Sequence, residues 1–515
     1  MSINKKGGQA ANSKIHGKDT ENSVNTNTKI TPDVIKSEIE QLTKPSEIKS
    51  NTDILKSLLG QIQPIDFVAI QYPNLTDEER KEKKVNRSEI RVLILNEILK
   101  IAETKKWALC KQGGSCYVYN GAYWKTLNED ELKHFLSDCA KAMGLKQTLS
   151  DDYKFVKELY EQFLFSAHLQ PPEYDNDTVL INLKNGTFRI TPKVQALNLF
   201  SLSHFLTYQL PFEYNEQATC PRFKKYLNKV LPDISAQLVL AEYVGYLFMR
   251  HGSGLKLEKC LILYGNGANG KSVFFEILSA LLGRENVSTF TLSELTDKTG
   301  YYRAEIANKL LNYASEISRE MNTDLFKKLV SGETFSARSP YEKPFEVKNY
   351  AKLIFNANEL PKNTEQTNAF FRRFIIVPFL VTIPENEQDK ELHKKIIDNE
   401  LSGVFNWVLE GLKRLLVNKK FTDCQAATKA LEQYQIESDS VQMFLNDKNY
   451  KPSNDNKHLL KDIYKEYKDY CDYDGYHTCS NRTFADRLRK MQYNIFKSGE
   501  RYVYIECESN SNNNS

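Results

Sequence analysis

The chain has 515 residues, of which 41% are hydrophobic and 11% aromatic, a globular composition too long for a single core. It contains no run of roughly 18 apolar residues that would span a membrane, and its N-terminus lacks the apolar core of a signal peptide. We therefore expect a cytoplasmic protein without a membrane partner. Nine cysteines without paired spacing suit a reducing compartment, and a net charge of +4 requires any nucleic-acid-binding surface to be local.

Residues 1–86 are expected to form a disordered tail and linker. No Phe, Trp or Tyr occurs in residues 1–66, and the first thirty residues are rich in Asn, Lys, Ser, Thr and Gly. So little apolar surface cannot offset the entropy that folding costs. A short amphipathic pattern, which would form either a docking helix or an isolated frayed one, lies at Ile54, Leu55, Leu58, Leu59 and Ile62.

Residues 87–210 are expected to form an α+β domain. Two hairpins are predicted, one turning at Asn120 and Gly121 and the other at Asn185 and Gly186, because Asn-Gly fits a tight hairpin turn. Aromatic side chains beside lysines in such hairpins could stack on bases, although a packed sheet is their commoner role. Apolar residues recur at helical spacing over 90–101, 129–143 and 152–167.

Residues 211–250, whose apolar spacing predicts two helices, are expected to form a helical cap before the segment that carries the chemistry. That segment reads GNGANGKS and matches the phosphate-loop pattern G-x-x-x-x-G-K-[ST]. An apolar strand pattern precedes it and a helical pattern follows it, as the motif requires. The candidate phosphate-binding residues are Gly265, Asn266, Gly267, Ala268, Asn269, Gly270, Lys271 and Ser272.

Two side chains of this loop have distinct expected roles. Lys271 would reach the β- and γ-phosphates of ATP, and the Ser272 hydroxyl would bind Mg²⁺ at the positive end of the helix. The alternative is a structural glycine-rich turn. ATP and Mg²⁺ are therefore the predicted cofactors.

Further polar positions adjoin apolar strand patterns downstream. Glu316 follows one such run, where a carboxylate would orient water or hold Mg²⁺. Asn358 follows another, at the strand end where open α/β sheets place ligands. Arg372 and Arg373 precede a third, where an arginine would stabilise phosphate charge in a neighbouring subunit or form a surface ion pair. The predicted α/β core, a parallel sheet with flanking helices, spans 251–411.

Residues 412–437 are expected to form a helical connector and 438–507 a winged helix-turn-helix, with a disordered tail over 508–515. Asn481 is the predicted N-cap of a recognition helix, and 502–505 alternates like a wing strand. Six Lys or Arg and two acidic residues lie between positions 481 and 501, as in a surface for duplex DNA. A basic helix in a protein-docking domain is the alternative. The candidate contacts are Arg482, Arg487, Arg489 and Lys490.

Several ordered motifs resemble the superfamily 3 helicases, and among them the phage and plasmid replicative helicases related to the poxvirus helicase-primase. The resemblance runs from about residue 117 to residue 505. It is carried by LINLKNG at 180–186, CPRF at 220–223, the phosphate loop, KKLVSGE at 327–333, KLIFNANELP at 352–361, FFRRF at 370–374 and FNWVLEGLKRLL at 405–416.

The resemblance implies an AAA+ core and a role for each candidate residue. Lys271 and Ser272 correspond to the phosphate and Mg²⁺ residues, and Asn358 to the polar sensor. Glu316 corresponds to the catalytic carboxylate, which also helps to hold the metal ion. Many members have a paired acid where this chain has Ser315, so Mg²⁺ here would depend on Ser272 and water. Arg373 corresponds to the arginine finger, with Arg372 as the alternative.

Such helicases also carry a hairpin that holds single-stranded DNA in the ring channel. It corresponds here to residues 335–348, where Arg338 and Lys343 would face phosphates and Tyr341 would stack on a base. Lys328, on the preceding helix, would add a phosphate contact. Cations and a π-face are what a non-specifically held strand requires.

The predicted function is therefore an ATP-dependent DNA helicase, a hexameric homo-oligomer in which a neighbouring subunit supplies the finger. The resemblance implies 3′ to 5′ movement on single-stranded and forked DNA during replication of a phage, plasmid or integrated element. Origin duplex DNA and a separate primase are further expected partners. The alternatives are an ATP-switched origin-binding initiator that does not unwind and, with less support, a small-molecule kinase.

Primase activity is not expected. A primase of the relevant type needs two carboxylates one residue apart on a strand, with a histidine nearby to complete the metal site. Asp175 and Asp177 lie in a polar turn without a close histidine, and Asp472 and Asp474 lie where a helix gives way to a loop.

Overall fold

A computed structural model describes residues 50–104, 108–112, 114–170, 175–252, 254–317, 321–338, 344–361 and 367–507. Residues 1–49 and 508–515, which belong to the predicted disordered tails, lie outside this part of the chain. Within it, no helix is both long and apolar enough to cross a membrane.

The first described helix, α2, lies within residues 1–86, which were predicted to form a disordered tail and linker. Ser50 caps it by accepting a hydrogen bond from Asp53 N, and Ile54, Leu55 and Leu58 are buried in the core of the N-terminal domain. The amphipathic stripe therefore packs on other helices of the same domain instead of fraying. The helices of this region are α2 (Asn51–Leu59), α3 (Phe67–Gln71), α4 (Asp77–Arg80), α5 (Arg87–Thr104), α6 (Glu129–Ala142), α7 (Gln147–Ser150) and α8 (Tyr153–Ser166).

Both predicted Asn-Gly hairpins are confirmed. Tyr119 pairs with Trp124 across the first turn, and Leu183 pairs with Gly186 across the second. Each hairpin has a third antiparallel strand, which gives the sheet orders β1-β2-β3 and β4-β5-β6. The strands are β1 (Ala108–Gln112), β2 (Ser115–Tyr119), β3 (Trp124–Leu127), β4 (Val179–Leu183), β5 (Gly186–Ile190) and β6 (Gln195–Asn198).

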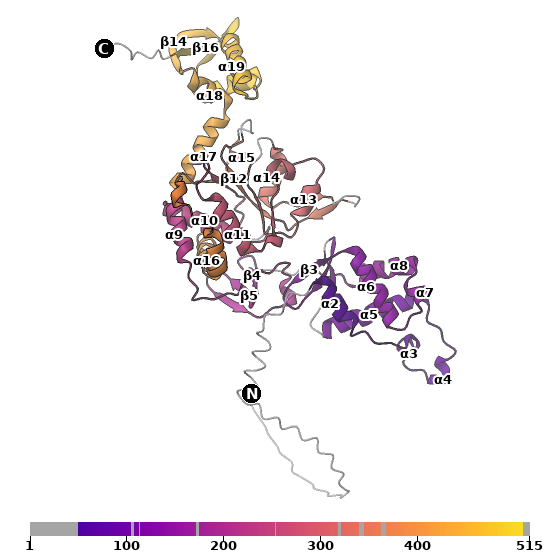
Figure 1. The fold of residues 1–515 in the computed structure, drawn as a ribbon. Helices are drawn as coiled ribbons and strands as arrows, with labels where there is room; N and C mark the ends of the chain where they lie inside the picture. Colours follow the sequence, from indigo (N-terminus) through magenta and orange to yellow (C-terminus); the bar gives the residue numbers. More distant parts are fainter. Residues whose placement is uncertain are drawn as a thin grey trace, which may run out of the picture. The chain divides into compact units, whose positions relative to one another are not determined.

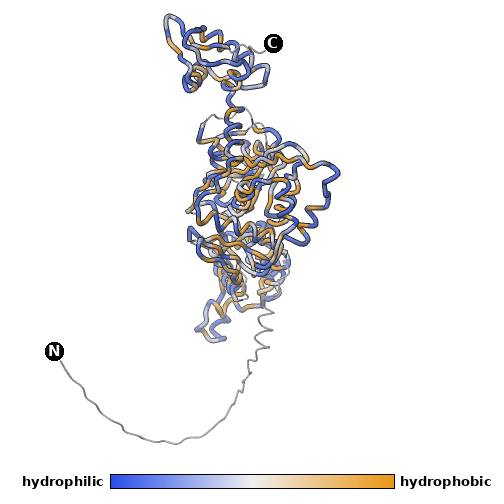
Figure 2. Tube along the Cα trace, turned by 90° about the vertical axis from the view of Figure 1, so that its left-hand side faces the viewer, coloured by the Kyte–Doolittle hydropathy of each residue, from blue (hydrophilic) through white to orange (hydrophobic). Residues whose placement is uncertain are grey.

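A parallel five-stranded sheet in the order β13-β7-β12-β9-β8 confirms the expected α/β class (Figure 1). Its central strands are almost entirely buried, as the continuous apolar runs in the sequence predict. Hydrophobic stretches run through the inside of this central body, and hydrophilic ones follow its outer loops (Figure 2). The strands are β7 (Cys260–Tyr264), β8 (Val287–Ser288), β9 (Leu311–Ala314), β12 (Lys352–Ala357) and β13 (Phe374–Pro378).

Three helices pack together beside this sheet, namely α9 (Pro221–Val230), α10 (Ile234–Tyr246) and α16 (Leu392–Asn418) (Figure 1). The predicted boundary between residues 411 and 412 falls inside α16. A Cβ on Gly411 would lie 2.4 Å from the Ala241 carbonyl carbon, so α16 and α10 approach closely at this position. The helical cap and the end of the predicted core thus share one hydrophobic cluster.

Shorter elements connect the sheet strands. The predicted hairpin around residues 335–348 is confirmed by antiparallel pairing of β10 (Phe335–Ala337) with β11 (Phe345–Val347). The connecting helices are α11 (Lys271–Leu282), α12 (Leu292–Leu295), α13 (Tyr301–Glu305), α14 (Thr323–Ser331) and α15 (Asn368–Phe371), and α17 (Gln425–Ser438) comes after α16.

The C-terminal region has its own core, formed by residues between Val441 and Ile505. It contains three helices and an antiparallel sheet of order β14-β16-β15, one strand more than the predicted pair. Ser480, and not Asn481, caps α20, because its hydroxyl accepts a hydrogen bond from Thr483 N. The elements are α18 (Ser440–Asp447), β14 (Tyr450–Leu459), α19 (Leu460–Asp474), α20 (Asn481–Lys490), β15 (Ile495–Ser498) and β16 (Glu500–Cys507).

Candidate functional site

The glycine-rich loop joins the carboxyl end of β7 to the first turn of α11. Gly265 has φ +153°, and a Cβ there would lie 2.2 Å from the Phe379 carbonyl oxygen. Gly270 has φ +88°, and a Cβ there would lie 2.8 Å from Val230 Cγ1. Both positions therefore require glycine, for close approach as well as for backbone conformation.

Lys271 is folded back into this loop and is 6% exposed. Its Nζ donates to the Asn266 carbonyl at 3.2 Å, to Asn269 Oδ1 at 3.1 Å and to Asn358 Oδ1 at 3.4 Å. Burial lowers the pKa of Lys271 from its ordinary value. The loop therefore holds a partly desolvated ammonium group on neutral oxygens, an environment that a phosphate anion would improve.

Strand register explains why Asn358 lies beside the loop. Ala357 of β12 pairs with Tyr264 of β7, so the residues that follow each strand emerge next to each other. On the other side of β12, Phe355 pairs with Ala314 of β9, which directs Glu316 to the same edge of the sheet. Three chain segments thus meet at the carboxyl ends of parallel strands, where such sheets bind ligands.

The residues expected to hold Mg²⁺ offer one hydroxyl and one carboxylate. Ser272, in the first turn of α11, and Glu316, after β9, are both exposed. This donor set fits Mg²⁺, which keeps several waters and takes few protein oxygens beside those of a bound phosphate. Among the described residues, no group of three His, Cys, Asp or Glu side chains could hold a metal by itself.

The two adjacent arginines occupy different environments. The Arg373 side chain is 10% exposed, and its guanidinium donates to the Ala369 carbonyl and to Ser331 Oγ, the latter at 2.9 Å. The Arg372 side chain is 65% exposed and forms a 3.7 Å ion pair with Glu258. The preferred finger candidate, Arg373, is therefore occupied within its own chain, which leaves Arg372 as the accessible guanidinium.

The β10–β11 hairpin presents part of its predicted nucleic-acid surface. Arg338 is exposed directly after β10, with its guanidinium 5.5 Å from the centroid of the Tyr301 ring. Lys328 is exposed on α14. Tyr341 and Lys343 lie outside the described residues. Tyr301, which is 36% exposed, was not identified from the sequence, because its partner lies 37 positions away at residue 338.

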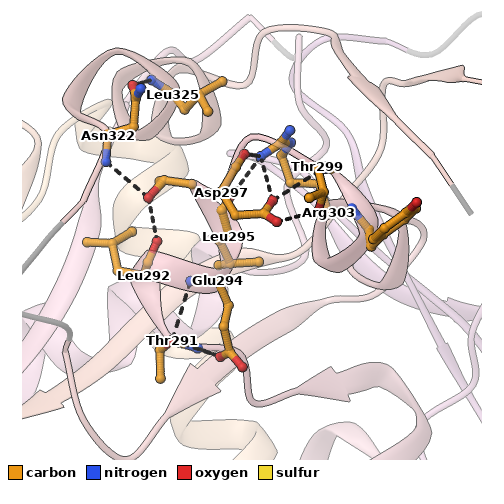
Figure 3. A network of polar contacts seen from close by, with 12 residues as sticks. Thr291, Leu292, Glu294, Leu295, Asp297, Thr299, Arg303, Asn322 and Leu325 are labelled. Atoms are coloured by element: carbon orange, nitrogen blue, oxygen red, sulfur yellow. Dashed lines mark hydrogen bonds and ion pairs between the residues drawn. The ribbon is translucent and has the colours of Figure 1, made fainter.

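A polar network fixes the segment that carries Tyr301 (Figure 3). The Asp297 carboxylate accepts a hydrogen bond from Gly300 N at 3.0 Å and forms an ion pair with Arg303 at 3.5 Å. Arg303 is 6% exposed and also donates to the carbonyls of Leu295 and Asp297. The base of the hairpin contacts this turn, because Arg338 N donates a hydrogen bond to the Gly300 carbonyl at 3.4 Å.

The C-terminal basic residues differ in availability. Arg482 and Lys490 are exposed on α20. Arg489 forms a 2.6 Å ion pair with Asp486, and Arg487 forms a 3.0 Å ion pair with Asp439, where its side chain is 21% exposed. Arg487 thus contributes to the junction of α18 and α20 and is less available to a ligand than the other three.

Comparison with known proteins finds two family models. One, described as D5 N terminal like, matches residues 94–232, and the other, a family of unknown function (DUF5906), matches residues 263–373. The second match covers the phosphate loop, Glu316, Asn358 and both arginines of the pair.

Two curated viral proteins are similar to this chain. Putative helicase L207/L206 of Acanthamoeba polyphaga mimivirus is 27% identical over 238 residues, which is 43% of this chain and 24% of that protein. Putative helicase 121R of Invertebrate iridescent virus 3 is 24% identical over 340 residues, which is 58% of this chain and 35% of that protein. The matches thus span only about a quarter to a third of these relatives.

Among solved structures, the A form apo structure of the NrS-1 C terminal region is similar at a TM-score of 0.45 and 15% identity. This comparison covers 79% of the present chain and 98% of the other.

Proposed function

We propose that this chain, which is related to the phage and viral helicase-primase-like family, is an ATP-dependent DNA helicase. The observation that carries the proposal is the meeting of Lys271 with Asn358, at 3.4 Å, beside a strand-loop-helix motif of phosphate-loop sequence. The order β13-β7-β12-β9-β8 supports an AAA+ core, since β12 lies between the phosphate-loop strand and the strand that leads to Glu316.

In this proposal the loop binds ATP through its backbone N–H groups. Lys271 leaves the loop carbonyls and binds the β- and γ-phosphates. The Ser272 hydroxyl and the Glu316 carboxylate would hold Mg²⁺. Mg²⁺, when bound, would neutralise charge on the phosphate oxygens. Glu316 orients the attacking water, and Asn358 contacts the γ-phosphate and so distinguishes ATP from its product.

A second subunit completes the site in this proposal. The exposed guanidinium of Arg372 reaches the nucleotide of the neighbouring subunit and stabilises the charge of the transferred phosphoryl group. Each subunit then gives a finger to one neighbour and receives one from the other, and such head-to-tail contacts form a ring when their rotation closes. We propose a hexamer on the resemblance to superfamily 3 helicases.

Single-stranded DNA is the proposed ligand of the β10–β11 hairpin. Arg338 and Lys328 supply cations for the phosphates, and the exposed ring of Tyr301 beside Arg338 adds a face on which a base can stack.

We propose 3′ to 5′ movement on forked DNA, during replication of a phage, plasmid or integrated element, with a separate primase as partner. Residues 438–507 are proposed to be a winged helix-turn-helix that binds origin duplex DNA through Arg482, Arg489 and Lys490.

Strand displacement on a forked substrate tests this function. The wild-type protein with ATP and Mg²⁺ is expected to separate the fork, and Lys271→Ala is expected to abolish both hydrolysis and separation. Native mass spectrometry with ATP and the fork would give the number of subunits in the assembly, which is expected to be six.

The basic residues of the C-terminal region, residues 438–507, also support a second candidate function, that of an ATP-switched initiator. Hydrolysis that depends on Lys271 but is accompanied by no displacement under any fork polarity would contradict the helicase and favour that initiator.

A further inference from the structure

Tyr226 links α9 to the phosphate loop through a single hydrogen bond. Its side chain is buried, and its hydroxyl donates to the Gly270 carbonyl oxygen at 2.8 Å. The same oxygen accepts the first helical hydrogen bond of α11, from Phe274 N at 3.1 Å. The backbone at the junction of loop and helix is therefore held from two directions.

The carbonyl in question belongs to the peptide unit between Gly270 and Lys271. A trans peptide is planar, so its C=O and its N–H point in opposite directions, and none of the described peptide bonds is cis. Holding the Gly270 oxygen therefore fixes the direction of the Lys271 N–H. Lys271 is the first residue of α11, and the N–H groups of a first helical turn have no intrahelical partner and attract anions.

The helix that carries Tyr226 is itself held in place. Glu400 of α16 is 4% exposed, and its carboxylate accepts hydrogen bonds from Arg222 N at 3.2 Å and Phe223 N at 3.0 Å, at the start of α9. At the other end of α9, Lys229 forms a 2.7 Å ion pair with Glu387. The Tyr226 hydroxyl thus reaches the loop from a helix that cannot shift freely.

We propose that Tyr226 is a positioning residue for nucleotide binding, whose hydroxyl orients the Gly270–Lys271 peptide so that the Lys271 N–H meets the β-phosphate. The inference rests on the proposed function, because it requires a nucleoside di- or triphosphate in the loop. Tyr226 contacts no ligand and acts only through this peptide unit.

The test compares two buried tyrosines that each lose one hydroxyl. Tyr226→Phe removes the hydrogen bond to Gly270. Tyr243→Phe, on the adjacent helix α10, removes hydrogen bonds to the carbonyls of Lys259 and Leu353 that lie away from the loop. The full-length protein and both variants would be titrated with MgADP and MgATP by calorimetry, and the melting temperature of each nucleotide-free variant would show that it is folded.

Tyr226→Phe is expected to weaken MgADP and MgATP equally, by about 2- to 10-fold, since the affected N–H faces a phosphate that both carry and one net hydrogen bond is of this size. Tyr243→Phe is expected to leave both affinities unchanged. Wild-type affinity in Tyr226→Phe, an equal loss in both variants, or a loss confined to MgATP would overturn the inference. If the wild-type protein bound neither nucleotide, the proposed function itself would be wrong.

Discussion

At the scale of single residues, neighbouring positions with the same chemistry have different surroundings. Arg372 and Arg373 are adjacent in the chain, yet one guanidinium is mostly exposed and the other is enclosed by Ala369, Ser331 and Glu258. A finger that serves another subunit must be accessible before assembly. The exposure of the two side chains therefore favours Arg372, which the family resemblance placed second, as the finger candidate.

Replacing Arg372 is expected to affect ATP hydrolysis, whereas replacing Arg373 is expected to affect stability. Arg372→Ala should reduce ATP hydrolysis by about a hundredfold or more with little change in stability, because an exposed ion pair contributes little to folding. Arg373→Ala should lower the free energy of unfolding by about 2 kcal/mol, because it removes a side chain that is only 10% exposed together with its hydrogen bonds to the Ala369 carbonyl and Ser331 Oγ. Steady-state hydrolysis and urea denaturation of both variants would check this.

A mixing experiment provides the control for the trans role. Arg372→Ala and Lys271→Ala are each expected to be inactive alone, but mixed rings contain sites with an intact lysine and an intact finger and should regain part of the activity. Full activity in Arg372→Ala, or an inactive Arg373→Ala of unchanged stability, would return the finger role to Arg373.

Lys352 is a buried lysine beside the helical cap. It is 6% exposed, its Nζ lies 4.6 Å from the centroid of the Tyr246 ring and donates to the Met249 carbonyl, and burial lowers its pKa to about 7. Between pH 7 and the ordinary lysine range near 10.5, the unfolded chain therefore binds a proton that the folded chain does not. Stability should rise with pH in this window, by roughly 1.4 kcal/mol per pH unit at most.

Lys352→Met isolates this contribution. The wild-type protein should gain free energy of unfolding, relative to Lys352→Met, as the pH rises from 7 to 9, and the difference should be constant below pH 7. Urea denaturation of both proteins at several pH values measures it. Parallel pH profiles above pH 7 would contradict the lowered pKa.

At the scale of elements, α16 is one continuous helix where the sequence patterns suggested a boundary. Its 27 residues run across the predicted boundary between core and connector, because Gly411 allows α16 to approach the backbone of α10. A Cβ on Gly245 of α10 would likewise lie 2.7 Å from Leu412 Cβ. The two glycines mark a tight helix crossing that also holds α9 and, through it, the phosphate loop.

Gly411→Ala is expected to destabilise the protein by about 1–3 kcal/mol, since the added methyl group must push the two helices apart. Val417→Ala, in the same helix but 54% exposed, is the matched control and should change stability by less than about 0.5 kcal/mol. Denaturation curves of the two variants give the comparison. A Gly411→Ala variant as stable as Val417→Ala would argue against the tight crossing.

At the scale of the whole molecule, the C-terminal region has a core separate from that of the parallel sheet. The preceding helix α17 packs on the core of the parallel sheet. Its Tyr434 side chain is buried against Phe371 and Phe374, and the Tyr434 hydroxyl donates to the Pro361 carbonyl at 3.0 Å. A truncation after Ser438 therefore removes the C-terminal core and leaves α17 packed on the core of the parallel sheet.

This truncation is expected to leave ATP hydrolysis without DNA within about twofold, and to weaken binding to duplex DNA by about tenfold or more. The slope of log affinity against log salt should fall by about one for each phosphate-contacting cation removed. Fluorescence anisotropy with a duplex would measure both. In the full-length protein, Arg482→Ala and Lys490→Ala should each give part of the effect, and an unchanged duplex affinity in the truncated protein would exclude the region as a duplex-binding unit.

Much of the local structure follows from the sequence itself. The Asn-Gly turns, the apolar strands and the loop GNGANGKS were predictable, because hairpin turns and glycine-rich loops depend on neighbouring residues. The meeting of Asn358 with the loop was also within reach, since the ends of parallel strands share one edge of a sheet.

Only the tertiary structure decided which side chains are accessible and which distant segments touch. Tyr226 reaches Gly270 across 44 positions, α2 finds its apolar partners in later helices, and Arg373 is buried by residues from α14 and α15. Periodicity says that a side chain is apolar or charged but does not name its partner. The sequence therefore determined the phosphate loop and its strand and helix, and the packing of distant elements determined how that loop is held.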